Sequence, residues 1–214
     1  MNYLDNILTK YSDGKIISFG FLLEEQQENT IIRVSEYIGK KESVRYIHDH
    51  TTRQPFIRLY EGLFPEKNID QVYAATRKQV TTTFPIKLKW AEIEETQVYV
   101  ILWGELNTEI RVLQLSLLKE INSLREGYYK EKYHRMDRYS RNYEYNSVKK
   151  WGWPYVTQYE PYLVIARAKS RFNLKKFEVE WNYKYCILNK FMMGIKVEPG
   201  NITRKQIIDL STTS

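Results

Sequence analysis

Two short apolar runs of the same form lie in the two halves of the chain. Residues 55–59 read PFIRL and residues 161–167 read PYLVIAR. Each has a proline, an aromatic residue, an aliphatic residue, a variable residue and a second aliphatic residue. A short apolar run that is entered through a proline is typical of a buried strand. We therefore predict two equivalent strands.

The variable positions decide what these strands present to their surroundings. Successive side chains of a strand point to opposite faces. Phe56 and Arg58 are therefore expected on one face of the first strand, and Tyr162 and Val164 on the matching face of the second. Each strand offers two side chains to one surface.

The remaining patterns predict helices and strands in alternation. Helical spacing predicts helices over 3–11, 24–39, 68–80 and 108–124, with Gly39 as a C-cap and Thr108 as an N-cap. Short apolar or alternating runs predict strands over 16–23, 44–47, 84–93, 97–104, 177–187, 191–197 and 203–210. Strand–helix–strand–helix–strand, given twice, predicts an α+β fold.

The paired runs carry a family resemblance. The chain resembles the two-histidine (2H) phosphoesterases, which include LigT-type RNA 2′,3′-cyclic phosphodiesterases and 2′-5′ RNA ligases. Their signature strands read Pro-His-aliphatic-Thr/Ser-aliphatic, and the second often ends in Ala-Arg. The frame is kept here, but Phe56 and Tyr162 replace the histidines, and Arg58 and Val164 replace the hydroxyl residues. The resemblance implies a degenerate member that lacks both histidines.

The resemblance also implies an architecture. It predicts a single LigT-like domain over residues 1–214, with two lobes, two antiparallel sheets flanking a central groove, and helices on the outside. Residues 1–14 would be an N-terminal helical extension, and a loop rich in tyrosine and arginine would be inserted at about 127–155.

Composition narrows the class of partner. The chain has 214 residues, a net charge of +7 and 18 tyrosines. A basic surface favours polyanionic partners such as nucleotides or RNA. Cys186 is the only cysteine, so no intramolecular disulfide is possible, and we expect a buried thiol. No segment has the length and apolarity of a membrane span or signal peptide, so we expect a cytoplasmic protein that does not bind membranes.

Loss of both histidines removes the family's reaction chemistry. In the resembled enzymes one histidine acts as general base and the other as general acid. Phe56 cannot transfer a proton, and a tyrosine such as Tyr162, with an ordinary pKa near ~10, is a poor base at neutral pH. We therefore expect no classical cyclic phosphodiesterase activity and no cofactor.

Arg58 keeps a binding role open. An arginine that points into a groove can bind a phosphate through two donors, and Tyr162 beside it could donate a hydrogen bond or stack on a base. The predicted groove site comprises Phe56, Arg58, Tyr60, Tyr162, Val164 and Arg167. In the alternative interpretation, Phe56 and Val164 close the groove into core, and Arg58 only forms a salt bridge.

Two further stretches offer chemistry. His48 and His50 flank Asp49 just ahead of the first run; no third metal ligand is evident nearby, so we expect no metal site. They could instead supply a displaced acid or base. The 127–155 stretch interleaves basic and aromatic residues, which suits a nucleic acid, a protein partner or simple packing over the sheet. Its candidate contacts are Arg135, Arg138, Tyr139, Arg141, Tyr143, Trp151 and Trp153.

Three functions therefore remain open at the level of the sequence. The first is a non-catalytic protein that binds a phosphorylated small molecule, a nucleotide or an RNA end in the groove. The second is an enzyme with rebuilt chemistry, in which Tyr162 is the acid, Arg58 the anion clamp, and His48 or His50 the base. The third is a protein-interaction module that uses the 127–155 loop.

Overall fold

Strands and helices alternate along the chain in the computed structural model, which describes residues 13–96, 98–128, 142–169, 181–198 and 201–210. The strands are β1 (Gly14–Leu22), β2 (Phe56–Pro65), β3 (Ile86–Glu95), β4 (Tyr99–Gly104), β5 (Tyr162–Arg167), β6 (Tyr185–Leu188), β7 (Lys190–Glu198) and β8 (Asn201–Asp209). The helices are α2 (Glu25–Lys41), α3 (Ile69–Val80), α4 (Thr108–Ile121) and α5 (Asn142–Trp151), with 3₁₀ turns at Glu66–Asn68 and Ser123–Arg125.

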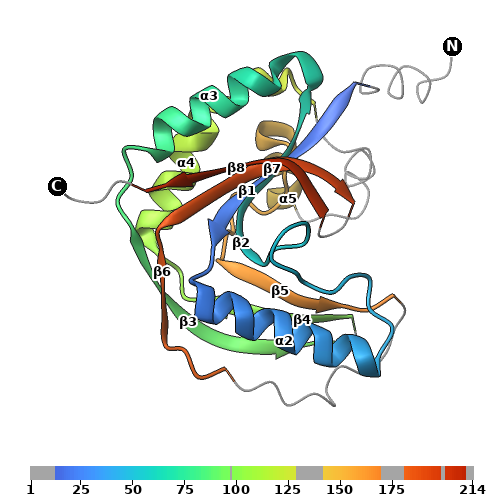
Figure 1. The fold of residues 1–214 in the computed structure, drawn as a ribbon. Helices are drawn as coiled ribbons and strands as arrows, with labels where there is room; N and C mark the ends of the chain where they lie inside the picture. Colours follow the sequence, from blue (N-terminus) through green and yellow to red (C-terminus); the bar gives the residue numbers. More distant parts are fainter. Residues whose placement is uncertain (1–12, 97, 129–141, 170–180, 199–200, 211–214) are drawn as a thin grey trace, which may run out of the picture.

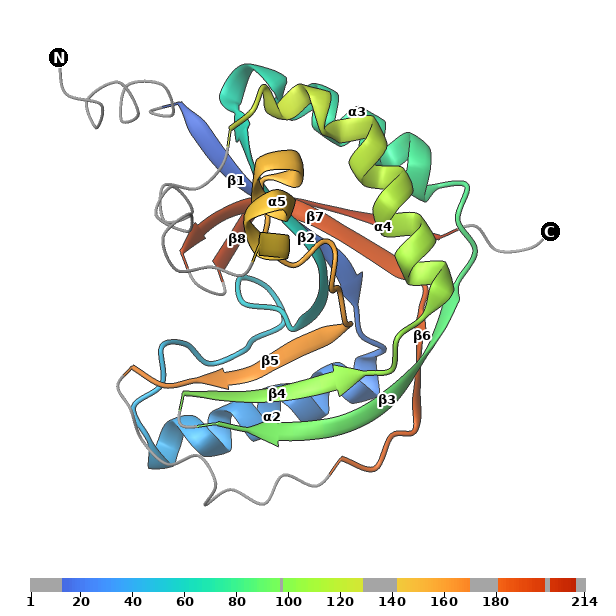
Figure 2. The same ribbon diagram turned by 180° about the vertical axis from the view of Figure 1, so that it is seen from behind.

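The described strands form two four-stranded sheets whose neighbouring strands are all antiparallel. The strand orders are β2-β1-β7-β8 and β5-β4-β3-β6. Helices α3 and α4 lie side by side against the first sheet, while α2 runs along the second (Figures 1 and 2). The predicted α+β fold with two antiparallel sheets and outer helices is confirmed. The two signature strands, β2 and β5, are each an edge strand.

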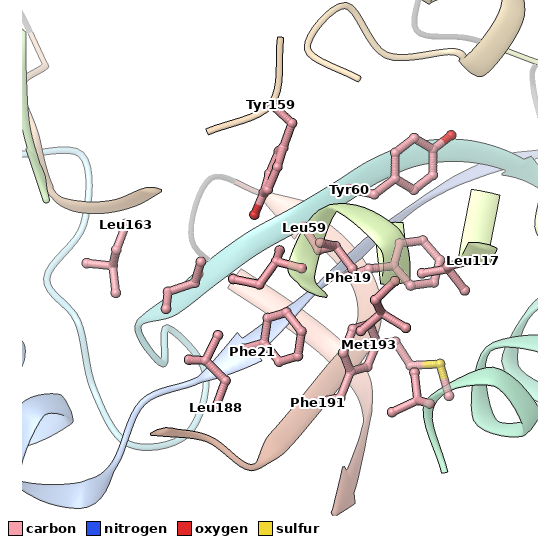
Figure 3. Packing of buried hydrophobic residues seen from close by; sticks show 14 of the residues in the cluster. Phe19, Phe21, Leu59, Tyr60, Leu117, Tyr159, Leu163, Leu188, Phe191 and Met193 are labelled. Atoms are coloured by element: carbon pink, nitrogen blue, oxygen red, sulfur yellow. The ribbon is translucent and has the colours of Figure 1, made fainter. Parts of the chain in front are cut away.

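One hydrophobic core joins the two sheets. Phe21 and Phe191 of the first sheet lie in the same cluster as Leu163 and Leu188 of the second (Figure 3). Cys186 belongs to this cluster as a free, buried thiol, and burial raises its pKa to about 12. A thiol in this setting packs as a small apolar side chain, as predicted.

Several predicted boundaries are wrong, each for a local reason. Gly39 lies inside α2, whose cap residue is Glu42. Asn107, and not Thr108, caps α4: its side chain accepts the Ile110 N–H. The predicted strand over 44–47 reduces to a single bridge between Val44 and Ala168. The predicted helix over 3–11 and residues 177–180 of the predicted strand over 177–187 lie outside the described residues, and the described part of that strand begins, as β6, only at Tyr185.

The 127–155 stretch is not the extended loop that the sequence predicts. Helix α5 occupies its second half, and residues 129–141 lie outside the described residues. Ser147 and Val148 are buried, whereas Tyr145, Lys149 and Lys150 are exposed. The helix is amphipathic, but its ten residues include few aliphatic side chains, and the tyrosines and charges between them favoured a loop in the sequence prediction.

Both signature strands contain a bulge at the same place. In β2, Phe19 pairs with Tyr60 and Gly20 pairs with Arg58, so Leu59 is the extra residue. In β5, Val100 pairs with Ala166 and Ile101 pairs with Val164, so Ile165 is the extra residue. A bulge inserts one residue and shifts every later side chain to the other face. The strict alternation assumed from the sequence therefore fails after this point in both strands.

Candidate functional site

A cavity of about 660 Å³ lies between the two lobes. Its lining residues come from β2 and β5, from the neighbouring strands β1, β4 and β7, from the segment between α2 and β2, and from the segment that follows α5: Ile16, Tyr46, Arg58, Glu61, Tyr99, Ile101, Trp103, Trp153, Tyr155, Gln158, Tyr159, Glu160, Tyr162, Val164, Arg167 and Lys196. This volume is in the range of small-molecule sites. The groove is therefore open, and the alternative in which it is closed into core is wrong.

Four of the six predicted groove residues line this cavity. They are Arg58, Tyr162, Val164 and Arg167. Phe56 borders a small adjoining pocket that shares Arg58 and Tyr162 with the main cavity. Alternation along each strand was sufficient to bring most of these side chains together.

Tyr60 does not lie in the groove. The bulge turns it into the core, where it is 1% exposed and stacks on Phe19 (Figure 3). Its hydroxyl donates to the Trp151 carbonyl at 2.6 Å, and burial raises its pKa. Glu61, which follows it, turns into the groove in its place.

Arg58 is the central cation of the site. Its Nη1 donates to the Tyr162 hydroxyl at 3.2 Å, and its Nε lies 3.9 Å from the Glu61 carboxylate. Its guanidinium also lies 5.8 Å from the centre of the Tyr162 ring, which is within cation–π range. Burial alone would lower the pKa of Arg58, but Tyr162 and Glu61 outweigh burial and hold it above the usual range. The guanidinium therefore stays charged.

Arg167 supplies a second cation from the opposite strand. The bulge in β5 directs it into the cavity, where its guanidinium lies 5.2 Å from the centre of the Tyr99 ring. The Nε atoms of both Arg58 and Arg167 are buried, and neither has a hydrogen-bond partner among the described residues. A buried donor without an acceptor carries a desolvation cost. Both arginines line the cavity, where an anionic ligand would offset part of this cost.

Aromatic rings form much of the remaining wall. Trp103 packs at 5.5 Å from Tyr162, and Trp153 packs edge-on to Tyr155 at the same separation of 5.5 Å. Tyr46 is largely buried, which raises its pKa, while Arg58 and Arg167 act in the opposite direction. A polarisable wall beside two cations suits a flat ring that carries an anionic group.

The segment after α5 is fixed in place as one wall of the cavity. The carbonyl oxygens of Lys150, Trp151, Trp153 and Val156 accept hydrogen bonds from the side chains of Arg125, Tyr60, Ser147 and Arg111, respectively. Tyr159 donates to the Arg58 carbonyl at 2.9 Å. These bonds position Trp153 and Tyr155 without any ligand.

The predicted loop contacts are therefore divided. Trp153 lines the cavity, whereas Trp151 packs against the core and Tyr143 lies on α5. Arg135, Arg138, Tyr139 and Arg141 lie outside the described residues.

Neither histidine ahead of β2 lines the main cavity. His48 is 7% exposed, and its ring nitrogens lie 2.7 Å from the Arg53 carbonyl oxygen and 2.8 Å from that of Val164. Burial lowers its pKa, although the two carbonyl contacts oppose this shift. His50 is exposed and pairs with Glu28 at 3.0 Å. Among the described residues, no group of three histidine, cysteine or acidic side chains could hold a metal ion.

Comparison with known proteins identifies the fold. No protein-family model and no curated protein matches the sequence. TT0787 of Thermus thermophilus superposes with a TM-score of 0.56 at 12% identity, covering 91% of this chain and 95% of that one. The chain adopts the LigT-like fold.

Further LigT-like structures support this assignment. E. coli LigT complexed with phosphate has a TM-score of 0.54 at 10% identity, over 94% of this chain and 99% of that one. E. coli LigT complexed with 3′-AMP has a TM-score of 0.55 at 12% identity, over 92% and 96%. The match spans nearly the whole of both chains.

Within the described part of this chain, no helix is long and apolar enough to cross a membrane.

The sequence missed most of the wall of this site. Tyr46, Tyr99, Trp103 and Lys196 come from segments outside either signature strand. Glu61 was missed because the bulge in β2 turns its side chain to the face of the strand that lines the groove. A signal for Glu61 exists in retrospect: it occupies the same place in PFIRLYE as Arg167 does in PYLVIAR.

Proposed function

We propose that this protein binds a nucleotide-like phosphorylated ligand in the central groove, without the cyclic phosphodiesterase chemistry of the family it resembles. The observation that carries this proposal is the pair of buried Nε atoms, from Arg58 and Arg167, that have no hydrogen-bond partner among the described residues. Phosphate oxygens are the acceptors that guanidinium groups bind most effectively.

The shape and composition of the cavity support a nucleotide. Its volume of about 660 Å³ can hold a mononucleotide. The rings of Trp103, Tyr155 and Tyr162 offer surfaces on which a base can stack. E. coli LigT, which has a similar fold, has been solved in complex with phosphate, with 3′-AMP and with ATP, which supports a ligand of this class here.

Binding is favoured over catalysis because the two strand positions that carry histidines in the resembled family hold Phe56 and Tyr162 here. Phe56 has no exchangeable proton, and the Tyr162 hydroxyl is engaged by Arg58. Among the described residues that line the main cavity there is no histidine. We expect no hydrolysis of 2′,3′-cyclic AMP on prolonged incubation, and turnover above the buffer rate would overturn this part of the proposal.

Thermal unfolding with and without ligand tests binding directly. A ligand that binds only the folded state stabilises it by about 2.7 kcal/mol at a concentration of 100 times Kd. We expect 3′-AMP to raise Tm, and Arg58→Ala to reduce affinity at least tenfold. Arg33→Ala is the matched control, because Arg33 is exposed on α2 and does not line the cavity. If Arg58→Ala binds as tightly as Arg33→Ala, the proposed site is wrong.

A further inference from the structure

A buried acidic side chain lies among the cations of the groove. Glu61 is 3% exposed, and its Oε2 accepts hydrogen bonds from Lys196 Nζ at 2.8 Å and from Ser18 Oγ at 3.1 Å. The same oxygen lies 3.9 Å from Arg58 Nε. The two cations on this side of the cavity therefore share an internal counter-ion.

The position of Glu61 is set by the backbone. The matching bulges of β2 and β5 turn a residue that follows them into the cavity, which is Glu61 in one strand and Arg167 in the other. A carboxylate at this place repels an anionic ligand and lowers its affinity. Ser18 and Lys196, from two neighbouring strands, nevertheless hold it there.

We propose that Glu61 sets the charge selectivity of the groove. Because it repels each negative charge of a ligand, it narrows the advantage that a doubly charged phosphomonoester would have over a singly charged phosphodiester. This inference rests on the proposed function and specifies the class of ligand for the same site.

The selectivity follows from local charge balance. Arg58, Lys196 and Arg167 attract an anionic ligand, and the Glu61 carboxylate, which lies beside the first two, opposes that attraction. A second negative charge on the ligand would face the carboxylate in a partly buried site, where water screens charges weakly. The repulsion from Glu61 grows in proportion to the charge of the ligand.

The test compares two ligands that differ in charge but have the same base and sugar. AMP carries two negative charges at pH 8, because the second pKa of a phosphate monoester is about 6, whereas the methyl ester of AMP carries one. Calorimetric titration of the full chain gives the ratio of the two affinities for the natural protein. Glu61→Gln, which keeps the shape and removes the charge, should raise affinity for the ester several-fold and for AMP by about the square of that factor.

A charge-balanced double variant separates electrostatics from misfolding. Lys196→Met alone should weaken AMP more than the ester. Glu61→Gln combined with Lys196→Met has the same local net charge as the natural protein, so the ratio of the two affinities should return towards its original value. The Tm of each variant confirms folding.

The two proposals fail in different ways. Equal changes in affinity for the two ligands in Glu61→Gln would overturn the role of Glu61 and leave the nucleotide site intact. Binding of neither ligand by the natural protein or by any folded variant would overturn the proposed function and the selectivity together.

Discussion

Strands β2 and β5 border the groove on opposite sides and are called its lips here. They have the same backbone arrangement but different side chains. Each is an edge strand that follows a proline, and each has its bulge at the fourth residue of the strand. Yet β2 presents Arg58 and Glu61 to the cavity, whereas β5 presents Tyr162, Val164 and Arg167.

The backbone arrangement of the two strands and the chemistry of the groove depend on different atoms. The frame is held by main-chain pairing, the bulge and the side chains that point into the core, such as Ile57 and Ile165. The side chains that face the cavity contribute little to these contacts. Substitution there can remove a reaction and leave the fold intact, which is what the resemblance to histidine-bearing strands implies.

The largest expected effect concerns the frame at the β2 bulge. Gly20 faces Arg58 across this bulge, and a Cβ there would collide with the Ile57 carbonyl oxygen. Since backbone can yield little, Gly20→Ala should lower the free energy of unfolding by about 3 kcal/mol in urea titration. Gly104→Ala in the other lobe is the control, because its Cβ would meet only the Leu88 side chain. Similar losses in the two variants would show that the bulge region is no more rigid than β4.

A smaller effect is expected from removing the hydroxyl of Tyr60 or of Tyr159, and it distinguishes a loss of stability from a loss of ligand affinity. Tyr60 and Tyr159 each donate one hydrogen bond to a carbonyl, that of Trp151 and that of Arg58, respectively. Replacing either with Phe leaves a carbonyl unpaired and should cost about 1–2 kcal/mol of unfolding free energy. Tyr159→Phe is expected to weaken 3′-AMP more than Tyr60→Phe, because the Tyr159 bond holds the backbone of Arg58 itself. An equal loss of affinity in Tyr60→Phe would contradict this division.

The two arginines should contribute unequally to binding. Arg58→Ala leaves Glu61 facing the ligand, whereas Arg167→Ala removes one cation from the opposite lip. We therefore expect Arg167→Ala to weaken 3′-AMP by about threefold, against at least tenfold for Arg58→Ala, in parallel titrations. A greater loss in Arg167→Ala would place the phosphate at β5.

The smallest effect concerns His48, which bridges the two lips. One of its ring nitrogens contacts the Val164 carbonyl in β5, and the other contacts the Arg53 carbonyl just before β2. Burial lowers the pKa of His48, so the unfolded chain takes up a proton first as pH falls. Stability should decline between about pH 7 and pH 5, and the decline should be shallower in His48→Gln. An unchanged slope in urea titrations would show that His48 does not contribute.

The alternation of side chains along a strand correctly predicted the groove residues that come before each bulge. Phe56, Arg58, Tyr162 and Val164 precede the bulges, and their positions at the cavities follow from the sequence alone. Tyr60 follows a bulge and was placed on the wrong side. A bulge depends on pairing with a neighbouring strand, so a single strand's pattern does not reveal it.

Helix α5 shows a second limit. Its stability comes from contacts outside its own sequence, such as the Ser147 hydroxyl bond to the Trp153 carbonyl and the packing of Val148 in the core. Its ten residues include few aliphatic side chains, so the spacing of apolar positions gave little signal. The sequence pattern of a helix that is held mainly by tertiary contacts therefore resembles that of a loop.

The segment after α5, which forms one wall of the cavity, determines whether this part of the chain can vary independently of the ligand site. Trp153 and Tyr155 line the groove, and the backbone of this segment is fastened to Arg111 and Ser147. The stretch from 127 to 155 is therefore not a cassette that can be excised or exchanged while the ligand site survives. Any sequence change that alters the length of α5 would reshape the groove as well.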